Sequence, residues 1–409
     1  MDTRTNLLWK QQCYFLAKEV FFLNFVGIDI SKFKHDCAVV GSDGEVLVAS
    51  FSFNNDCDGF ASLLSLLSNL KGEIKIGLES TGHYGQNLKL FLETNNFSFM
   101  EINPLMIKKF VSCKTLRRTK TDSLDSMSIA QYLMTTDYIP YPKSFHHFET
   151  LKSLTRFRLN LVRQRSHQLV SITNILDKIF PEFKPFFRGK LSSTALYILN
   201  NYSSPEKIAN MNSKSYDLIR RKSKGHFLAS DFSKLKQLAK TTIGHSNQFL
   251  LSELKVVLDI YFQMDSKIKE IEKQILDLVN SLKPAILTVP GIGYLAAATI
   301  LSEFGDFSRF KSPSKMLAFA GLEPSFFQSG TYENSGKMVK HGSPYLRYAL
   351  MNCCLPLINS DIVFADYYAK KRSEGKPYRV ALTHVAKKLL RVIYTIQTKN
   401  VPYHRSLIR

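Results

Sequence analysis

The chain has 409 residues, of which 44% are hydrophobic, so it is long enough to bury a large core in two or three domains. Its 55 Lys and Arg residues outnumber its 34 Asp and Glu residues, and the formal net charge of +21 favours a polyanionic partner. No apolar run is long enough to span a bilayer, and no cleavage site follows the amphipathic start at 1–24, so we expect neither a membrane segment nor a signal peptide. Six scattered cysteines without metal-binding spacing are typical of a reduced, cytoplasmic protein.

After this N-terminal extension, residues 25–53 have the alternating hydrophobicity of three strands. These are Phe25–Ile30, Asp36–Val40 and Val46–Phe53, with a glycine-containing hairpin turn between the last two. A helix to Leu70, a strand ending at Glu79, a helix over 85–95, a strand near 97–102 and a helix beginning near Asp122 are predicted next. Three antiparallel strands followed by alternating helices and strands is the order of the ribonuclease H-like (RuvC-like) fold, which we predict for residues 25–139.

The middle of the chain, residues 140–284, is predicted to be helical. Pro140 and Pro142 mark a linker, and leucine spacing over 151–176 predicts a long helix. From Leu254 to Leu282 apolar residues alternate spacings of three and four, which is typical of a coiled coil. Its partner is either the 151–176 helix, as a hairpin, or the same helix of another subunit. Residues 181–245 have no clear pattern.

Residues 285–409 are predicted to form a helical C-terminal domain, so the fold class is α/β followed by all-α. Pro290-Gly291-Ile292-Gly293 resembles a helix-hairpin-helix turn, in which the amides of Gly291 and Gly293 would bind a phosphate backbone. Residues 361–409 contain eleven Lys and Arg against three Asp and Glu, which makes the tail strongly basic.

Four acidic residues are candidates for catalysis. Asp29 lies in the first strand on the face opposite its apolar residues, and Glu79 ends a later strand. Asp122 and Asp125 are three residues apart at the start of a helix, so both point to the same side. Four carboxylates gathered in one place would repel one another unless a cation held them, and hard oxygen ligands suit Mg²⁺. The sequence therefore predicts a phosphodiester site with two Mg²⁺ ions, for which Mn²⁺ can substitute.

Each acidic residue also has an ordinary explanation. Asp29 and Glu79 can be solvated acids at strand ends, and Asp122 and Asp125 can complement a helix dipole. The four together, in this order along this predicted topology, favour the metal site. The basic residues beside them would hold a nucleic-acid backbone against the metals, and they include Arg117, Arg118 and Lys120.

These motifs resemble the DEDD transposases of bacterial insertion sequences, the insertion-sequence-110 group. The acidic pattern of that family's RuvC-like domain is matched by Gly27-Ile28-Asp29-Ile30-Ser31, Leu78-Glu79-Ser80-Thr81-Gly82 and Lys120-Thr121-Asp122-Ser123-Leu124-Asp125. Its C-terminal transposase domain is matched by Val289-Pro290-Gly291-Ile292-Gly293, Phe319–Pro324, Gln328-Ser329-Gly330, Lys340-His341-Gly342-Ser343 and Leu346-Arg347. The resemblance covers about residues 25–135 and 285–395.

The resemblance implies a nucleophile and a second nucleic acid. In that family a serine of the C-terminal domain attacks a DNA phosphate and forms a covalent 5′-phosphoserine link, and Ser329 is the matching residue. Taken alone, Ser-Gly is an ordinary turn, and Ser325 and Ser335 lie nearby. Lys340 and Arg347 would hold a phosphate, although lone basic residues are usually solvated. The family also uses a structured guide RNA; the net charge fits RNA and DNA together or DNA alone.

We therefore expect a transposase or site-specific DNA recombinase of the bacterial cytoplasm and nucleoid, acting as a homodimer or homotetramer on DNA with a guide RNA. The first alternative is a metal-dependent nuclease or Holliday-junction resolvase that uses water as nucleophile. The second is a basic nucleic-acid-binding protein without catalytic activity. The four intact carboxylates argue against the second.

Overall fold

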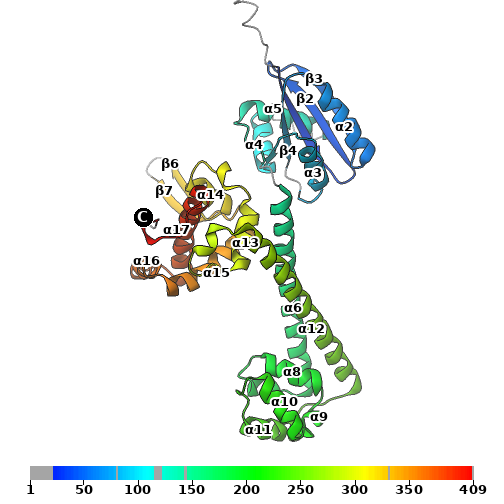
Figure 1. Ribbon diagram of the computed structural model, residues 1–409, viewed down its shortest axis with the longest axis vertical. Helices are drawn as coiled ribbons and strands as arrows, with labels where there is room; N and C mark the ends of the chain where they lie inside the picture. Colours follow the sequence, from blue (N-terminus) through cyan, green and yellow to red (C-terminus); the bar gives the residue numbers. More distant parts are fainter. Residues whose placement is uncertain (1–21, 80–81, 115–121, 142–144, 330–331, 408–409) are drawn as a thin grey trace, which may run out of the picture. The chain divides into compact units, whose positions relative to one another are not determined.

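The computed structural model describes residues 22–79, 82–114, 122–141, 145–329 and 332–407. The chain divides into two compact units, one that ends at His147 and one that starts at Phe148. Figure 1 traces the elements of both units along the chain.

The first unit is built on a five-stranded sheet. Its strands lie in the order β3-β2-β1-β4-β5. β1, β2 and β3 are antiparallel neighbours, whereas β4 runs parallel to β1 and β5 runs parallel to β4. The bounds are Leu23–Ile30 for β1, Lys34–Gly41 for β2, Val46–Asn54 for β3, Glu73–Glu79 for β4 and Phe99–Ile102 for β5, each within two residues of the strand that periodicity predicts.

Helices cover both faces of this sheet. On one face α2 (Cys57–Asn69) and α3 (Gln86–Thr94) pack on the even-numbered residues of β1, such as Val26 and Ile28. On the other face α5 (Asp122–Thr135) packs on the odd-numbered residues, and α4 (Pro104–Lys114), which is not among the predicted helices, packs beside it. Asp56 caps α2, because its carboxylate accepts the backbone N–H of Gly59 at 2.8 Å.

Two long helices organise the first part of the second unit. α6 (Phe145–Ile179) and α12 (Gln248–Leu282) are antiparallel neighbours, since Arg158 of α6 pairs with Glu272 and Arg165 pairs with Asp265. The α12 residues buried along its length include four of the predicted heptad positions: Leu254, Ile268, Ile271 and Ile275. Of the two partners that the heptad pattern allowed, the structure pairs α12 with α6 of the same chain.

Residues 181–247 form a cluster of short helices that we call the helical cap; the sequence showed no clear pattern over 181–245. It gathers at one end of the α6–α12 pair (Figure 1) and shares a core with the facing ends of both helices, including Ile172, Ile175, Leu254 and Leu258. Its helices are α7 (Phe183–Phe186), α8 (Ser193–Asn201), α9 (Pro205–Ala209), α10 (Ser213–Lys222) and α11 (Ala229–Lys240).

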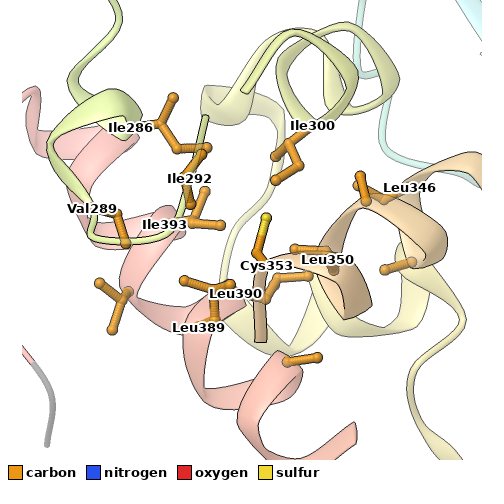
Figure 2. Close-up of a cluster of buried hydrophobic side chains, with 14 of the residues drawn as sticks. Ile286, Val289, Ile292, Ile300, Leu346, Leu350, Cys353, Leu389, Leu390 and Ile393 are labelled. Atoms are coloured by element: carbon orange, nitrogen blue, oxygen red, sulfur yellow. The ribbon is translucent and has the colours of Figure 1, made fainter. Parts of the chain in front are cut away.

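The rest of the second unit packs helices around one apolar core. Figure 2 shows side chains from the segment before α13, from α13 and from α15 meeting those of α17, among them Ile292, Ile300, Leu350 and Leu389. A bidentate pair of Arg156 in α6 with the buried Glu303 in α13 joins this part to the long helices. The helices are α13 (Tyr294–Phe304), α14 (Pro313–Ala320), α15 (Pro344–Ser360), α16 (Ile362–Ser373) and α17 (Tyr378–Lys399), with the short 3₁₀ helices η1 (Ala285–Thr288), η2 (Phe307–Arg309) and η3 (Arg405–Leu407).

Two details of the predicted C-terminal domain are wrong. An antiparallel hairpin of β6 (Pro324–Ser329) and β7 (Tyr332–Met338) interrupts the helices, so the domain is not all-α. Aromatic residues on both sides of Gly330 are a strand–turn–strand pattern, which explains the hairpin. The segment before Pro290 is the 3₁₀ helix η1, so the helix-hairpin-helix resemblance extends only to the turn and the following α13.

Within the described ranges, no single helix has both the length and the apolar composition of a membrane span. α15 and α16 meet those criteria only when taken together, and they are bent by 108° at their junction.

Candidate functional site

Asp29 and Glu79 lie side by side at the carboxyl ends of two parallel strands. β1 and β4 pair through Gly27 with Gly77 and Ile28 with Leu78, and both acidic residues come directly after these pairs. Because aligned residues of parallel strands point to the same face, Asp29 and Glu79 share the face of Gly27 and Gly77. This is the face covered by α5. The structure thus brings together two of the four predicted carboxylates from segments 50 residues apart.

Gly27 lets α5 approach this face more closely than any other residue would. A Cβ atom on Gly27 would lie 2.2 Å from the carbonyl oxygen of Ser126 and 2.3 Å from the backbone nitrogen of Ala130. Asp125 directly precedes Ser126, so the first turn of α5 lies over Gly27 of β1. Gly27 is two residues before Asp29 in the same strand. Asp125 is half-buried there. Asp122 begins α5 one turn earlier, but its side chain is outside the described residues.

A fifth carboxylate, Asp36 of β2, belongs to the same face and was not among the predicted site residues. It is the direct cross-strand partner of Asp29 and is 4% exposed. It accepts a hydrogen bond from the Ser52 hydroxyl and pairs with the Lys34 ammonium at 3.5 Å. We call Asp36, Asp29 and Glu79 the carboxylate row. The signal for Asp36 was its position: a tight turn after Ile30 places residue 36 opposite residue 29.

Oxygen donors from neighbouring strands and from the start of a helix suit a hard divalent cation. The carboxylate row places three acidic side chains on the adjacent strands β2, β1 and β4, on the face that α5 covers. Among the side chains that the structure describes, however, no three His, Cys, Asp or Glu form a cluster close enough to hold a metal ion. The fit therefore rests on the shared face and the donor chemistry, with Asp122 outside that set.

Ser329 lies at the far end of the β6–β7 hairpin. The hairpin pairs Pro324 with Met338 at its base and Ser329 with Tyr332 at its other end. Met338 packs against the apolar core, so the base is anchored. Five residue steps of about 3.3 Å carry the backbone of Ser329 roughly 17 Å from that base. Its side chain, like those of Ser325 and Ser335, is outside the described residues.

The loop at residues 340–342 is folded against the end of α14. Arg347 Nη1 donates to the carbonyl oxygens of Ala320 at 3.2 Å and Gly342 at 2.6 Å, and the N–H of Lys340 donates to the carbonyl of Gly321 at 3.2 Å. Burial lowers the pKa of the Arg347 guanidinium from its ordinary value. Arg347 thus organises this loop, and the Lys340 side chain is exposed on it.

The two predicted turn glycines differ in their surroundings. Gly291 has a φ of 81°, and a Cβ atom there would lie 2.7 Å from the backbone nitrogen of Leu357 in α15. Packing alone therefore requires this glycine. Gly293 is exposed at the start of α13, and a Cβ atom there would contact nothing within 4 Å. The three predicted basic contacts Arg117, Arg118 and Lys120 lie outside the described residues.

Two family models match the chain and together cover more than half of it. A DEDD model of the IS110 group, described as "Transposase", matches residues 26–181, and a second, described as "Transposase IS116/IS110/IS902 family", matches residues 283–369. The first range includes all four predicted carboxylates. The second includes Ser329, Lys340 and Arg347.

Three curated relatives align over nearly their whole length. The "Insertion element IS116 uncharacterized 44.8 kDa protein" of Streptomyces clavuligerus is 23% identical over 91% of this chain and 94% of the relative. The "Insertion element IS900 uncharacterized 42 kDa protein" of Mycobacterium paratuberculosis is 23% identical over 93% and 97%. The "Pilin gene-inverting protein" of Moraxella bovis is 21% identical over 94% and 98%.

Proposed function

The chain belongs to the DEDD transposases of the insertion-sequence-110 group, and from this premise we propose that it cleaves and rejoins DNA through a covalent link to Ser329 beside a carboxylate-bound magnesium site. As a member of that family it is a DNA transposase, and the family suggests a dependence on divalent metal. The serine link, the metal ligands and a guide RNA are our proposals. The observation that carries the reaction is the shared face of Asp29, Glu79 and the first turn of α5.

We assign metal binding to Asp29, Glu79, Asp122 and Asp125. Two Mg²⁺ ions held there would neutralise charge on the scissile phosphate and favour ionisation of an attacking hydroxyl. Asp36 of β2 lies beside Asp29 and accepts a hydrogen bond from the Ser52 hydroxyl. It therefore adds a negatively charged group next to the proposed metal ligands.

The chemical step is a transesterification. The Ser329 oxygen forms a bond to phosphorus, and the bond from phosphorus to the 3′ oxygen of the neighbouring nucleotide breaks. The serine loses a proton and the departing 3′ oxygen gains one, so the step is balanced without a nucleotide cofactor. A second 3′ hydroxyl then reverses the reaction with a new partner strand. The position of Ser329 at the end of an anchored hairpin supports its assignment over Ser325, next to the base, and Ser335, halfway along.

The experiment is a Ser329→Ala variant with Ser335→Ala as its matched control. Supercoiled DNA that carries the element ends is incubated with Mg²⁺, and protein–DNA adducts are detected on denaturing gels. We expect Ser329→Ala to lose both strand cleavage and the adduct, and Ser335→Ala to keep both. Mg²⁺-dependent cleavage by Ser329→Ala, without any adduct, would instead establish the water-dependent nuclease or junction resolvase.

DNA and RNA are the proposed partners. The net charge of +21 supports a large polyanionic ligand. The name of the Moraxella relative describes inversion of a gene, which supports strand exchange here. If a guide RNA takes part, recombination requires RNA transcribed from the flanking DNA. We therefore expect recombination to be lost after ribonuclease treatment. Strand exchange between two DNA sites also favours a homodimer or homotetramer. Measuring the mass of the protein–DNA complex tests this number of subunits.

A further inference from the structure

The helical cap is strongly basic and has no role in the proposed chemistry. Residues 181–247 contain twelve Lys or Arg and four Asp or Glu, a net charge of +8. Basic residues are concentrated in the last turn of α10, which contains Arg220, Arg221 and Lys222. A concentration of positive charge on one small helical cluster favours a polyanion at this place on the molecule.

Two turns of the same type project from the cap. Arg188 and Gly189 follow the end of α7, and Lys224 and Gly225 follow the end of α10; all four residues have positive φ. In each turn the glycine N–H donates to a carbonyl five residues earlier, Lys184 or Arg220 respectively. A Cβ atom on either glycine would contact nothing within 4 Å, so the space beside both turns is open. Arg188 and Lys224 are both exposed there.

A cavity of about 420 Å³ is lined by parts of both turns. One wall is aromatic, since Phe186, Phe187 and Phe227 contact one another with ring centroids 4.9–6.4 Å apart. Phe186 and Phe187 are only half-buried, so parts of their rings remain accessible. The other walls carry hydroxyl and imidazole groups, which come from Ser192, Thr194, Ser223 and His226.

The acidic residue in this lining is already engaged. The Asp231 carboxylate accepts the backbone N–H of Leu228 at 2.9 Å and so caps α11. A second cavity of about 430 Å³ lies on the α6 side of the first turn and is lined by Lys184, Gly189 and Lys190. Cavities on both sides of the Arg188–Gly189 turn suit a linear polymer better than a single small molecule.

We propose that this surface of the helical cap binds an unpaired segment of RNA. A single strand offers phosphates to Arg188 and Lys224 and an unstacked base to the aromatic wall. Ser192 and Ser223 already bond the backbone, whereas the Thr194 hydroxyl and the His226 imidazole in the same lining are suited to a ribose 2′-hydroxyl, which favours RNA over DNA. Duplexes keep their bases stacked inside and cannot use the wall. The choice of RNA rests on the guide RNA of the proposed function, whereas the binding surface itself does not.

The test compares two charge-reversal pairs in the full chain. Arg188→Glu with Lys224→Glu changes the two basic turns of the proposed surface, and Lys214→Glu with Lys240→Glu makes the same charge change at exposed residues that belong to neither turn and line neither cavity. Binding of a fluorescent, unstructured RNA is measured by anisotropy over a series of salt concentrations. We expect the first pair to weaken binding about tenfold and to reduce the salt slope by about 1.4, which is two lost phosphate contacts on a single strand. The control pair should change affinity less than about twofold.

Two further measurements address the aromatic wall and the type of nucleic acid. Phe186→Leu keeps the apolar volume but removes a ring, and we expect at least about fivefold weaker RNA binding with an unchanged melting temperature. RNA with photoreactive uridine should crosslink to peptides within residues 181–227. Equal losses in both charge-reversal pairs, crosslinks confined to other regions, or equal affinity for single-stranded DNA or duplex RNA would overturn the proposal. A Ser329→Ala chain that binds RNA but does not cleave DNA shows that the two proposals succeed or fail separately.

Discussion

Substitution of Gly27 by Ala tests whether the close approach of α5 to β1 builds the candidate site. The new methyl group would lie 2.2 Å from the Ser126 carbonyl oxygen and 2.3 Å from the Ala130 nitrogen, both backbone atoms. Ordinary contact begins near 3.4 Å, so α5 must move away from the sheet by about 1 Å. Neither a rotamer change nor a local side-chain shift can absorb this overlap.

The expected cost follows from what α5 buries. Ile129 and Leu133 of α5 are fully buried against the sheet, and burying each is worth about 1.5–3 kcal/mol. A gap of about 1 Å forfeits up to half of the packing attraction, so we expect a loss of about 2 kcal/mol of unfolding free energy. The shift also moves Asp122 and Asp125 away from Asp29. We therefore expect a higher Mg²⁺ requirement for DNA cleavage, by about tenfold or more.

Urea denaturation measures the first effect, and Mg²⁺ titration of cleavage under folded conditions measures the second. Gly85→Ala is the matched control, because its nearest atom is the flexible Cδ1 of Ile30 at 2.8 Å, on the other face of the sheet. A Gly27→Ala protein with the stability and Mg²⁺ requirement of the control would refute the reasoning that α5 contact creates the site.

Three further predictions concern single groups. Asp29→Asn should abolish Mg²⁺-dependent DNA cleavage, because it removes one carboxylate ligand of the proposed metal site; cleavage with an unchanged Mg²⁺ requirement would contradict this. Arg156→Ala should cost about 2–3 kcal/mol of unfolding free energy, since it leaves Glu303 buried without its bidentate partner, and an added Glu303→Gln change should recover part of that loss in urea denaturation. Burial lowers the pKa of His35 below its ordinary 6.5, so the unfolded chain binds a proton that the folded chain excludes, and stability should be lost as pH falls below about 6.5. His35→Gln should reduce that pH dependence of the unfolding free energy, and an identical slope would contradict the assignment.

Local patterns of the sequence determined the strands of the first unit and its acidic candidates, although they missed α4. Alternating apolar residues specify strands, and the strands of the first unit lie within two residues of their predicted bounds. A carboxylate within an otherwise apolar strand is informative by itself, which is why the sequence made Asp29 a candidate. The heptad pattern likewise located α12, because its apolar stripe must be buried against some partner.

Tertiary structure decided which of these residues meet. The role of Asp36 depended on register across β1 and β2, and periodicity within either strand contains no information about it. The β6–β7 hairpin, which contains Ser329, was missed because short β-prone runs among helices are ambiguous in sequence. The helical cap was missed for another reason: its short helices are stabilised by a core shared with α6 and α12, so their own patterns are weak. Contacts between distant segments, which supply most of the burial energy, cannot be read from neighbouring residues alone.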